Sequence, residues 1–543
     1  MHRSISRFIG GAVLLVTLAA CADDSRVTAP QVESRSSAAA SNEDQLPEYD
    51  TWHPGEEQSL RVARQVPGFG GFSFDEQGNM ILYMKNPRDA SAVGLARAIL
   101  GPYHASQRGG WKREAARPEI IVREAQFTFA ALHRYRSRIE AEVFATPGVQ
   151  FTDLDEQVNR LVIGIDRARA DEARRTVELI LSRRGVPREA VDFEMGLQYI
   201  SEPTPPCEFG DPNCNPDPCA TDPSACESET GQTTDPCRID PSSCEPDPCV
   251  AGDAWCSPGY FEMFAANNDL RGVVRPILGG TLVTNVPANA FPAPGTLGFQ
   301  VWYCPPSTLG GGACAYYHVV TSHQTGAYAQ VADVRFYQPK SDAANDAVIG
   351  REAYDTRWHT HPFTVRIDGG TATSQCSATL KCRRSDAALI RAQGPSHGFG
   401  YLVRPANPPY SDGYDHGSAQ FALNPSTYFG IRIAWEGVAE QYQTVTKIGA
   451  ATGWRTGQVL RKCIDKLRDG YIVFRCQTEV EWSLSRSGDS GAPVFKYGSD
   501  GTAMLVGLHS AGDPNRGYYA PLANLRNDFG LRNDNYVDFD VIR

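Results

Sequence analysis

The chain has 543 residues, too many for one hydrophobic core, so two or three domains are expected. An apolar content of 41% and a charged content of 21% are typical of globular proteins. The formal net charge of -11 argues against a nucleic-acid partner.

The N-terminus has the pattern of an export signal. A basic segment, MHRSISRF, precedes an apolar run over 9–20 that is shorter than the roughly 20 residues a bilayer core requires. The run ends in LAAC, which resembles a bacterial lipobox, so residues 1–20 are expected to be a lipoprotein signal peptide and Cys21 the lipidated residue. Cleavage without lipid attachment is the alternative. The expected location is the cell envelope, outside the cytoplasm and anchored to a membrane by lipid.

Two segments of different texture follow the signal. Residues 21–48 are rich in Ser, Ala, Asp and Glu and predict a disordered tether. Residues 49–201 predict an α/β unit, with strand patterns in NMILYMKN and NRLVIGID and helical patterns in EAQFTFAALHRYRSRIEAEVF and RADEARRTVELILSRRG. In the last of these, the apolar residues share one helical face and Gly185 supplies the C-cap.

Residues 202–257 form a linker rich in Cys, Pro and Asp, with almost no apolar residues to make a core. Eight cysteines occur there in two similar sets, Cys207, Cys214, Cys219 and Cys226, then Cys237, Cys244, Cys249 and Cys256. Small disulfide-stapled loops are therefore expected. Zinc is disfavoured because six residues separate paired cysteines, where about two to four are usual. Calcium stays open, although no Asp-x-Asp-x-Asp-Gly loop occurs.

From 268 to 543 the pattern is mainly β. Short apolar or alternating stretches lie between Gly, Pro and Asn residues, among them GGTLVTNV, TLGFQVWY, YYHVVTS, GYIVFRCQTEVEW and AMLVGLHS. An antiparallel sandwich or barrel is expected, with enough chain for two small barrels. Apart from Cys21, the 14 remaining cysteines are an even number suited to disulfides in an oxidising compartment. Six of them form local pairs, Cys304 with Cys314, Cys376 with Cys382, and Cys463 with Cys476.

The segment SRSGDSGAPVF places Ser490 on a Gly-rich turn. A serine nucleophile needs a base and a carboxylate that orients the base. His323 ends the apolar run VVTSH, and Asp386 begins the run DAALI. Asp355 and Asp368 are weaker candidates for the acid because no apolar run follows them.

These three motifs, in this order, resemble those of chymotrypsin-like serine proteases, and especially the streptogrisin and alpha-lytic branch. GGTLVTN, TLGFQV and KIGAATGWRTGQV extend the similarity over most of 277–530. VPGFGGFSFDEQGNMILYM, DLDEQVNRLVIGI and RRGVPREAVDFE resemble the pro-regions of that branch. The resemblance implies a mainly β, double-barrel protease domain over 268–543. It also implies an α/β pro-domain over 49–201 that assists folding and blocks the site.

The resemblance also implies roles for single residues. Ser490 would be the nucleophile, His323 the general base and then acid, and Asp386 the group that orients the base. The backbone N–H groups of Gly488 and Ser490 would form the oxyanion hole. Asp489 would accept an ion pair or hydrogen bond that holds the loop in shape.

Two features depart from the family pattern. Gln324 follows the histidine where a cysteine is usual, and Ala492 replaces a glycine. A metal site at His359 and His361 would lack a third ligand, so neither a metal nor another cofactor is expected.

Substrate selectivity would depend on the residues around the nucleophile. Leu484 occupies the position where trypsin-like members carry an aspartate, which disfavours cleavage after basic residues. Ser487 and His509 resemble a serine and a histidine that line the pocket of glutamate-specific members, and Ser510 and Gly512 are expected beside them. Selectivity for Glu is therefore a hypothesis.

The sequence thus predicts a lipid-anchored serine endopeptidase made as a zymogen. Its partners would be a peptide or protein substrate, its own pro-domain and a membrane. Cleavage between 202 and 276 would release the protease domain. One alternative is a surface-anchored binding protein with an inactive protease-like domain. An esterase is disfavoured because Ser490, in GDSGA, does not stand in a Gly-x-Ser-x-Gly elbow and the candidate groups do not follow the order Ser-Asp-His.

Overall fold

The computed structural model describes one N-terminal unit, residues 56–196, and segments of a C-terminal unit, residues 264–542. In the first, 108–114 and 116 are not described. The described segments of the second are 264–265, 274–275, 277–285, 293–304, 314–322, 334–338, 348–355, 363–367, 370–374, 376, 380–392, 400–405, 430–468, 470–482, 485, 488–512, 516–529 and 539–542. The expected signal peptide, Cys21, the tether and the Cys-rich linker lie outside these residues.

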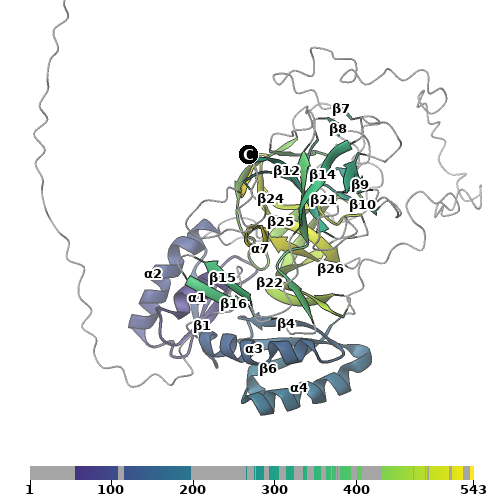
Figure 1. Ribbon diagram of the computed structural model, residues 1–543. Coiled ribbons are helices and arrows are strands. Elements are labelled where there is room, and N and C mark those ends of the chain that lie inside the picture. Colours follow the sequence, from purple (N-terminus) through teal and green to yellow (C-terminus); the bar gives the residue numbers. More distant parts are fainter. Residues whose placement is uncertain are drawn as a thin grey trace, which may run out of the picture. The chain divides into compact units, whose positions relative to one another are not determined.

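The N-terminal unit alternates helices and strands (Figure 1). In chain order it contains α1 (Glu57–Ala63), β1 (Phe69–Phe74), β2 (Met80–Met84), α2 (Ala90–Ser106), β3 (Ile120–Glu124), α3 (Phe129–Phe144), β4 (Val149–Asp155), β5 (Arg160–Asp166), α4 (Ala170–Arg184) and β6 (Val191–Gly196). Strands β1, β2 and β3 form one small sheet, and β4, β5 and β6 pair in that order. The four segments predicted from periodicity are all confirmed.

Local sequence explains where these helices begin and end. The side chain of Thr128 accepts a hydrogen bond from the N–H of Ala131 and caps α3. Gly185, with φ of 67°, ends α4 in the left-handed conformation that glycine adopts without a steric penalty. Helix α2 was not predicted, because Gly94, Gly101 and Pro102 weaken its helical pattern.

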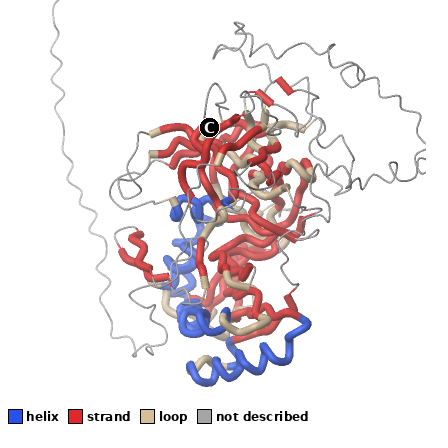
Figure 2. The backbone as a smooth tube through the Cα atoms, turned by 45° about the vertical axis from the view of Figure 1, so that its right-hand side comes forward, coloured by secondary structure: helices blue, strands red, loops and turns tan. Residues whose placement is uncertain are grey.

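The C-terminal unit is rich in strands, as predicted (Figure 2). Eight strands form one sheet in the order β10-β9-β13-β14-β18-β12-β11-β27. Their bounds are β9 (Leu282–Asn285), β10 (Ala293–Thr296), β11 (Gln300–Tyr303), β12 (Ala315–Thr321), β13 (Arg335–Tyr337), β14 (Val348–Asp355), β18 (Ala387–Ala392) and β27 (Phe539–Val541). Two short hairpins pair β7 (Phe264–Ala265) with β8 (Val274–Arg275) and β15 (Phe363–Ile367) with β16 (Gly370–Ser374).

Six strands of a second sheet close into a ring. Each pairs with the next in the order β21-β22-β23-β26-β25-β24, and β24 pairs again with β21. These are β21 (Thr444–Gly449), β22 (Gly453–Arg468), β23 (Ile472–Trp482), β24 (Pro493–Tyr497), β25 (Ala503–Gly512) and β26 (Arg516–Pro521). Strands β17 (Lys381–Arg383), β19 (Tyr401–Leu402) and β20 (Ile431–Glu436) join this sheet, and α7 (Leu522–Asp528) follows it.

The two sheets of the C-terminal unit share one hydrophobic core. Phe299 and Val319 from the first sheet are buried in the same cluster as Trp454, Phe495 and Leu508 from the second. Trp454 is 1% exposed and packs edge-on against Phe495. Burial of these shared apolar side chains holds the two sheets together.

The three local cysteine pairs are confirmed as disulfides. Sulfur–sulfur bonds join Cys304 to Cys314, Cys376 to Cys382, and Cys463 to Cys476. The last of these bridges links β22 to β23. Beyond the ring, β22 also pairs with β4, with Lys466 opposite Phe151, so one sheet runs from the ring into the N-terminal unit.

Candidate active site

The candidate nucleophile, Ser490, lies in a tight turn between β23 and β24. Gly488 and Gly491 have φ values of 97° and 92°, which residues other than glycine rarely adopt. The Ser490 hydroxyl lies 3.4 Å from the backbone oxygen of Ser510 in β25. Ser490 is 6% exposed. The motif GDSG therefore builds a turn that holds one serine against a neighbouring strand.

The buried side chain of Asp489 holds this turn in place. Its carboxylate is fully buried and forms an ion pair with Lys447 of β21, also fully buried. It also accepts hydrogen bonds from the backbone N–H and the hydroxyl of Thr452, at 3.0 Å and 2.6 Å. A buried charge is tolerated when it is paired and hydrogen-bonded in this way. An added Cβ on Gly449 would lie 2.1 Å from Asp489 Oδ1, so glycine is required there.

Thr296 of β10 holds the other side of the turn. Its hydroxyl donates to the carbonyl of Gly488 at 2.7 Å, and its N–H donates to the carbonyl of Ser490 at 2.8 Å. The same hydroxyl accepts from the N–H of Ala450 at 2.9 Å. One threonine therefore connects the turn both to the first sheet and to the segment that cradles Asp489.

Gly298 lies between the Ser490 turn and β12, the strand that precedes position 323. Its N–H donates to the carbonyl of Val319 in β12 at 2.9 Å. An added Cβ would lie 2.9 Å from that oxygen and 3.1 Å from the carbonyl oxygen of Gly491. Only a residue without a side chain therefore fits at position 298, between β12 and the turn.

Asp386 lies at the start of β18, next to the end of β12. Its carbonyl accepts a hydrogen bond from the N–H of Ser322 at 3.1 Å, and residue 322 directly precedes His323. Asp386 is fully buried, and its Oδ2 lies 3.1 Å from Nη1 of Arg468. The backbone thus places the candidate acid in register with the position just before the candidate base. His323 itself lies outside the described residues.

Asp355, the competing acid, has a different set of partners. It pairs with Arg383 at 3.1 Å and accepts from the Ser322 hydroxyl at 2.7 Å. Arg383 also donates to that hydroxyl and to the carbonyl of Ala387. These contacts tie β14, β17 and β18 together. Asp368, the other candidate, is not among the described residues.

His509 is fully buried on β25, one residue before Ser510. Its Nε2 lies 3.1 Å from the hydroxyl of Ser485, which lies 3.4 Å from Nζ of Lys447. A series of polar contacts therefore runs from His509 through Ser485 to Lys447, which pairs with Asp489. Ser487 and Leu484 lie outside the described residues, whereas Ser510 and Gly512 are buried beside His509 as part of the same strand.

Sequence reasoning missed several residues of this site. Lys447 lay within a segment quoted for its family resemblance, yet its role depends on a neighbour 42 residues away. Thr296 and Arg468 carry no motif at all. Their contacts arise from the packing of two sheets, which periodicity does not report.

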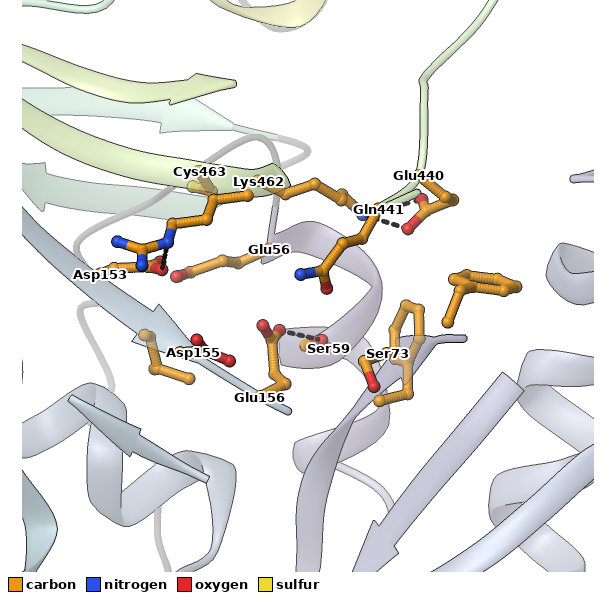
Figure 3. Close-up of a pocket in the computed structure, with 14 residues that line it drawn as sticks. Glu56, Ser59, Ser73, Asp153, Asp155, Glu156, Glu440, Gln441, Lys462 and Cys463 are labelled. Atoms are coloured by element: carbon orange, nitrogen blue, oxygen red, sulfur yellow. Dashed lines mark hydrogen bonds and ion pairs between the residues drawn. The ribbon is translucent and has the colours of Figure 1, made fainter. Parts of the chain in front are cut away.

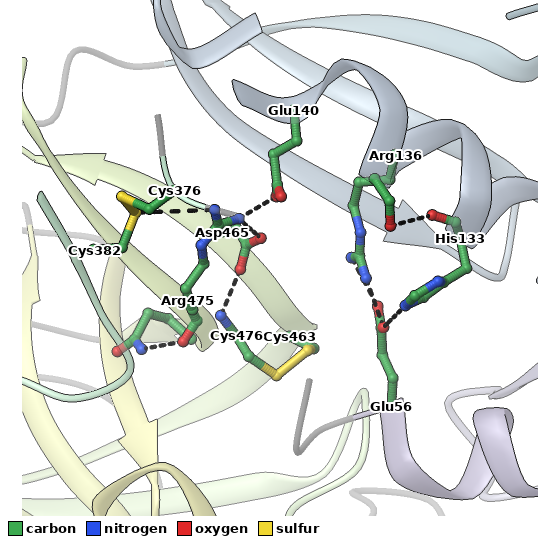
Figure 4. A network of polar contacts seen from close by, with 12 residues as sticks. Glu56, His133, Arg136, Glu140, Cys376, Cys382, Cys463, Asp465, Arg475 and Cys476 are labelled. Carbon is green, nitrogen blue, oxygen red and sulfur yellow. Dashed lines mark hydrogen bonds and ion pairs between the residues drawn. A yellow bond between two sulfur atoms is a disulfide. The ribbon is translucent and has the colours of Figure 1, made fainter. Parts of the chain in front are cut away.

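The N-terminal unit contacts the β22–β23 hairpin through buried charges (Figure 4). Glu140 of α3 pairs with Arg475 of β23, and Arg475 also pairs with Asp465 at 2.7 Å. The N–H of Cys476 donates to Asp465 at 2.7 Å. Burial raises the pKa of Glu140 to about 8, although the positive charge of Arg475 opposes the shift.

A pocket rich in carboxylates lies beside this contact (Figure 3). Asp153 and Glu156 approach it from the N-terminal unit, and Glu440 and Lys462 from the C-terminal unit. Lys462 Nζ lies 2.7 Å from both oxygens of Glu440. Burial raises the pKa of Glu156 to about 8 and that of Asp153 well above its ordinary value.

Within the described ranges, no group of three or more His, Cys, Asp or Glu side chains has the arrangement of a metal site. No helix in the same part of the chain is both long and apolar enough to cross a membrane.

No protein-family model matches the chain, and no curated protein matches its sequence. Among solved structures, it is similar to protease A of Thermobifida fusca, with 15% identity, coverage of 47% of this chain and 96% of that one, and a TM-score of 0.28. A Nocardiopsis protease gives 15% identity, 47% and 96% coverage and a TM-score of 0.29. A glutamic acid specific serine protease, described as using a histidine triad in substrate binding, gives 15% identity, 47% and 98% coverage and a TM-score of 0.28.

Proposed function

We propose that this protein is a serine endopeptidase of the chymotrypsin-like kind, with a double-barrel protease domain and a triad of Ser490, His323 and Asp386. The observation that carries the proposal is the junction at Gly298. There Gly298 lies between the turn that holds Ser490 and β12, the strand that leads to His323. The end of that strand is hydrogen-bonded to buried Asp386.

The reaction proceeds in two steps. His323 takes the Ser490 proton as the oxygen attacks the substrate carbonyl, and it then gives this proton to the leaving amine, so that an acyl-enzyme forms. A water molecule, deprotonated by the same imidazole, attacks the ester. The acid product leaves and Ser490 regains its proton. Asp386 stabilises the imidazolium that forms in each step.

The N–H groups of Gly488 and Ser490 form the oxyanion hole in this mechanism. Support comes from Thr296, which fixes the carbonyls of the same two residues, and from the ion pair of Asp489 with Lys447. A turn held before substrate arrives has little reorganisation to undergo in the transition state. Loss of one such donor typically raises the barrier by about 3 kcal/mol.

His509 and Ser487 would select Glu at the residue before the scissile bond. Support comes from the burial of His509 next to Ser510, whose carbonyl touches the nucleophile. An imidazole at a pocket floor can become cationic, and a substrate carboxylate offsets the cost of burying that charge.

The N-terminal unit would be a pro-domain, and the protein a zymogen anchored by lipid at Cys21 and exported from the cytoplasm. Support comes from the contacts of this unit with β22 and β23 of the closed ring. Cleavage between 202 and 276 would release the protease domain. Full-length protein that stays intact while it hydrolyses peptides would show that release is not needed.

A peptide panel varied at the residue before the scissile bond tests the proposed activity. The parent chain should cleave, with preference for Glu, and Ser490→Ala should lose at least about a thousandfold in kcat/KM. Ser182→Ala, which removes an exposed hydroxyl in α4, is the matched control and should keep full activity. Preference for large apolar residues would overturn the Glu assignment alone. A parent chain that hydrolyses nothing, even after cleavage between the two units, would favour a binding protein with an inactive protease-like domain.

A further inference from the structure

Arg468 lies at the C-terminal end of β22, where its guanidinium meets the candidate catalytic acid. Nη1 of Arg468 is 3.1 Å from Oδ2 of Asp386. Asp386 is fully buried and Arg468 is 5% exposed, so water screens this pair very little. The guanidinium carbon also lies 5.8 Å from the centre of the Phe474 ring, which limits its freedom to move.

The same arginine lines a small pocket that also includes Ser510. The pocket is lined by Lys466, Arg468, Phe474, Gln477, Ser510, Ala511 and Tyr518. The carbonyl of Ser510 is the atom that contacts the Ser490 hydroxyl. Arg468 therefore touches the acid at one end of the proposed triad and lines a pocket that adjoins the other end.

We propose that Arg468 is a positioning residue that holds Oδ2 of Asp386, the acid of the proposed triad. This rests on the proposed function. An arginine is suited to the task, since its planar guanidinium is always charged and directional.

The arrangement has an electrostatic consequence. The negative charge of Asp386 favours the cationic form of the base, and the nearby positive charge of Arg468 partly cancels that effect. With Arg468 in place, the base should therefore stay neutral and active at lower pH.

Several other ionisable groups face this pair. Lys466 approaches from β22 and Tyr518 from β26, with 3.2 Å between Nζ and the phenolic oxygen. Asp528 of α7 accepts hydrogen bonds from Ser385, the residue before Asp386. Arg384, the residue before Ser385, is buried, and the negative charge of Asp528 acts on its guanidinium. All of these remain in an Arg468 variant, so the difference from the parent chain isolates the guanidinium.

Arg136 provides a matched control. It forms a buried ion pair with Glu56 in the N-terminal unit, with 2.6 Å between Nη2 and Oε2. Its loss should destabilise the fold by leaving a buried charge without its partner, and neither residue belongs to the candidate active site. A change seen with Arg468→Gln and not with Arg136→Gln therefore reports positioning and not general damage.

The experiment measures kcat/KM against pH for the full chain and for Arg468→Gln, Arg468→Lys and Arg136→Gln, using the best peptide from the panel. Arg468→Gln should move the acidic limb to higher pH by about one unit, and should lower kcat about tenfold with little change in KM. Arg468→Lys should restore the limb, and Arg136→Gln should leave it in place. Urea unfolding checks that each variant is folded.

Two outcomes would overturn the proposal. If folded Arg468→Gln keeps the acidic limb and kcat of the parent chain, Arg468 has no positioning role and the proposed function stands. If a fluorophosphonate probe labels Ser490 neither in the parent chain nor in the chain cleaved between 202 and 276, the proposed function fails and this inference fails with it. Labelling of these two forms thus separates the two failures.

Discussion

Among single residues, buried charges with specific partners hold the candidate active site together. Lys447 and Asp489 are both fully buried, and the carboxylate also receives hydrogen bonds from Thr452. Removing one partner of such a pair is costly, because the remaining charge is left in a medium of low dielectric constant. The pair therefore commits the Ser490 turn to one conformation.

Lys447→Met should destabilise the protein by about 3–5 kcal/mol and slow fluorophosphonate labelling of Ser490 at least about tenfold. The double variant Lys447→Met with Asp489→Asn removes both charges and keeps an acceptor for Thr452. It should recover much of the stability without recovering the labelling rate. Urea unfolding and labelling kinetics measure both effects. A Lys447→Met variant as stable as the parent chain would contradict the role given to this pair.

At the scale of elements, strand β4 joins the N-terminal unit to the closed ring. Phe151 in β4 is 5% exposed and stands opposite Lys466 in β22. Its ring lies 5.4 Å from Nζ of Lys466 and 5.1 Å from the guanidinium of Arg461. Apolar burial and cation–π contacts thus act together across the strand pair.

Phe151→Ala should lower the free energy of unfolding of the full chain by about 3–5 kcal/mol, because it opens a cavity and removes both cation–π contacts. Val158→Ala, at a residue 50% exposed after β4, should change it by less than about 0.5 kcal/mol. Chemical denaturation followed by tryptophan fluorescence compares the two. Equal effects would show that the β4–β22 contact contributes little.

The elements also show what sequence could and could not predict. Clear apolar periodicity predicted strands β2 and β5 and helices α3 and α4. The two helices also have capping residues. The order of the strands in the sheets was not predicted, because β22 pairs with β4, which lies some 300 residues earlier in the chain. Within the candidate site, motifs single out Ser490 and Asp386 as candidates, whereas the contacts of Thr296 and Arg468 arise only from the packing of the sheets.

At the scale of the whole molecule, stability should depend on pH through the contact between the two units. Glu140 is buried there, and its pKa is raised to about 8 from an ordinary value of 4.5. Between these two values the folded chain binds more protons than the unfolded chain. Stability from this group is therefore complete below about pH 4.5 and falls as pH rises towards about 8.

Glu140→Gln should flatten this dependence, since an amide keeps hydrogen-bonding capacity and does not titrate. The parent chain should lose on the order of 1–3 kcal/mol between the two pH values and the variant less. Urea unfolding at several pH values measures the difference. A parent chain whose stability rises across this window, with Glu140→Gln parallel to it, would contradict the assignment.

The most direct test of the central claim is to map a fluorophosphonate adduct by mass spectrometry, on the full chain and on the chain cleaved between 202 and 276. An activated serine reacts with this probe, whereas an ordinary turn serine does not. We expect an adduct on Ser490 that forms faster after cleavage and is absent in Ser490→Ala. No adduct on Ser490 in either form, from protein shown to be folded, would contradict it.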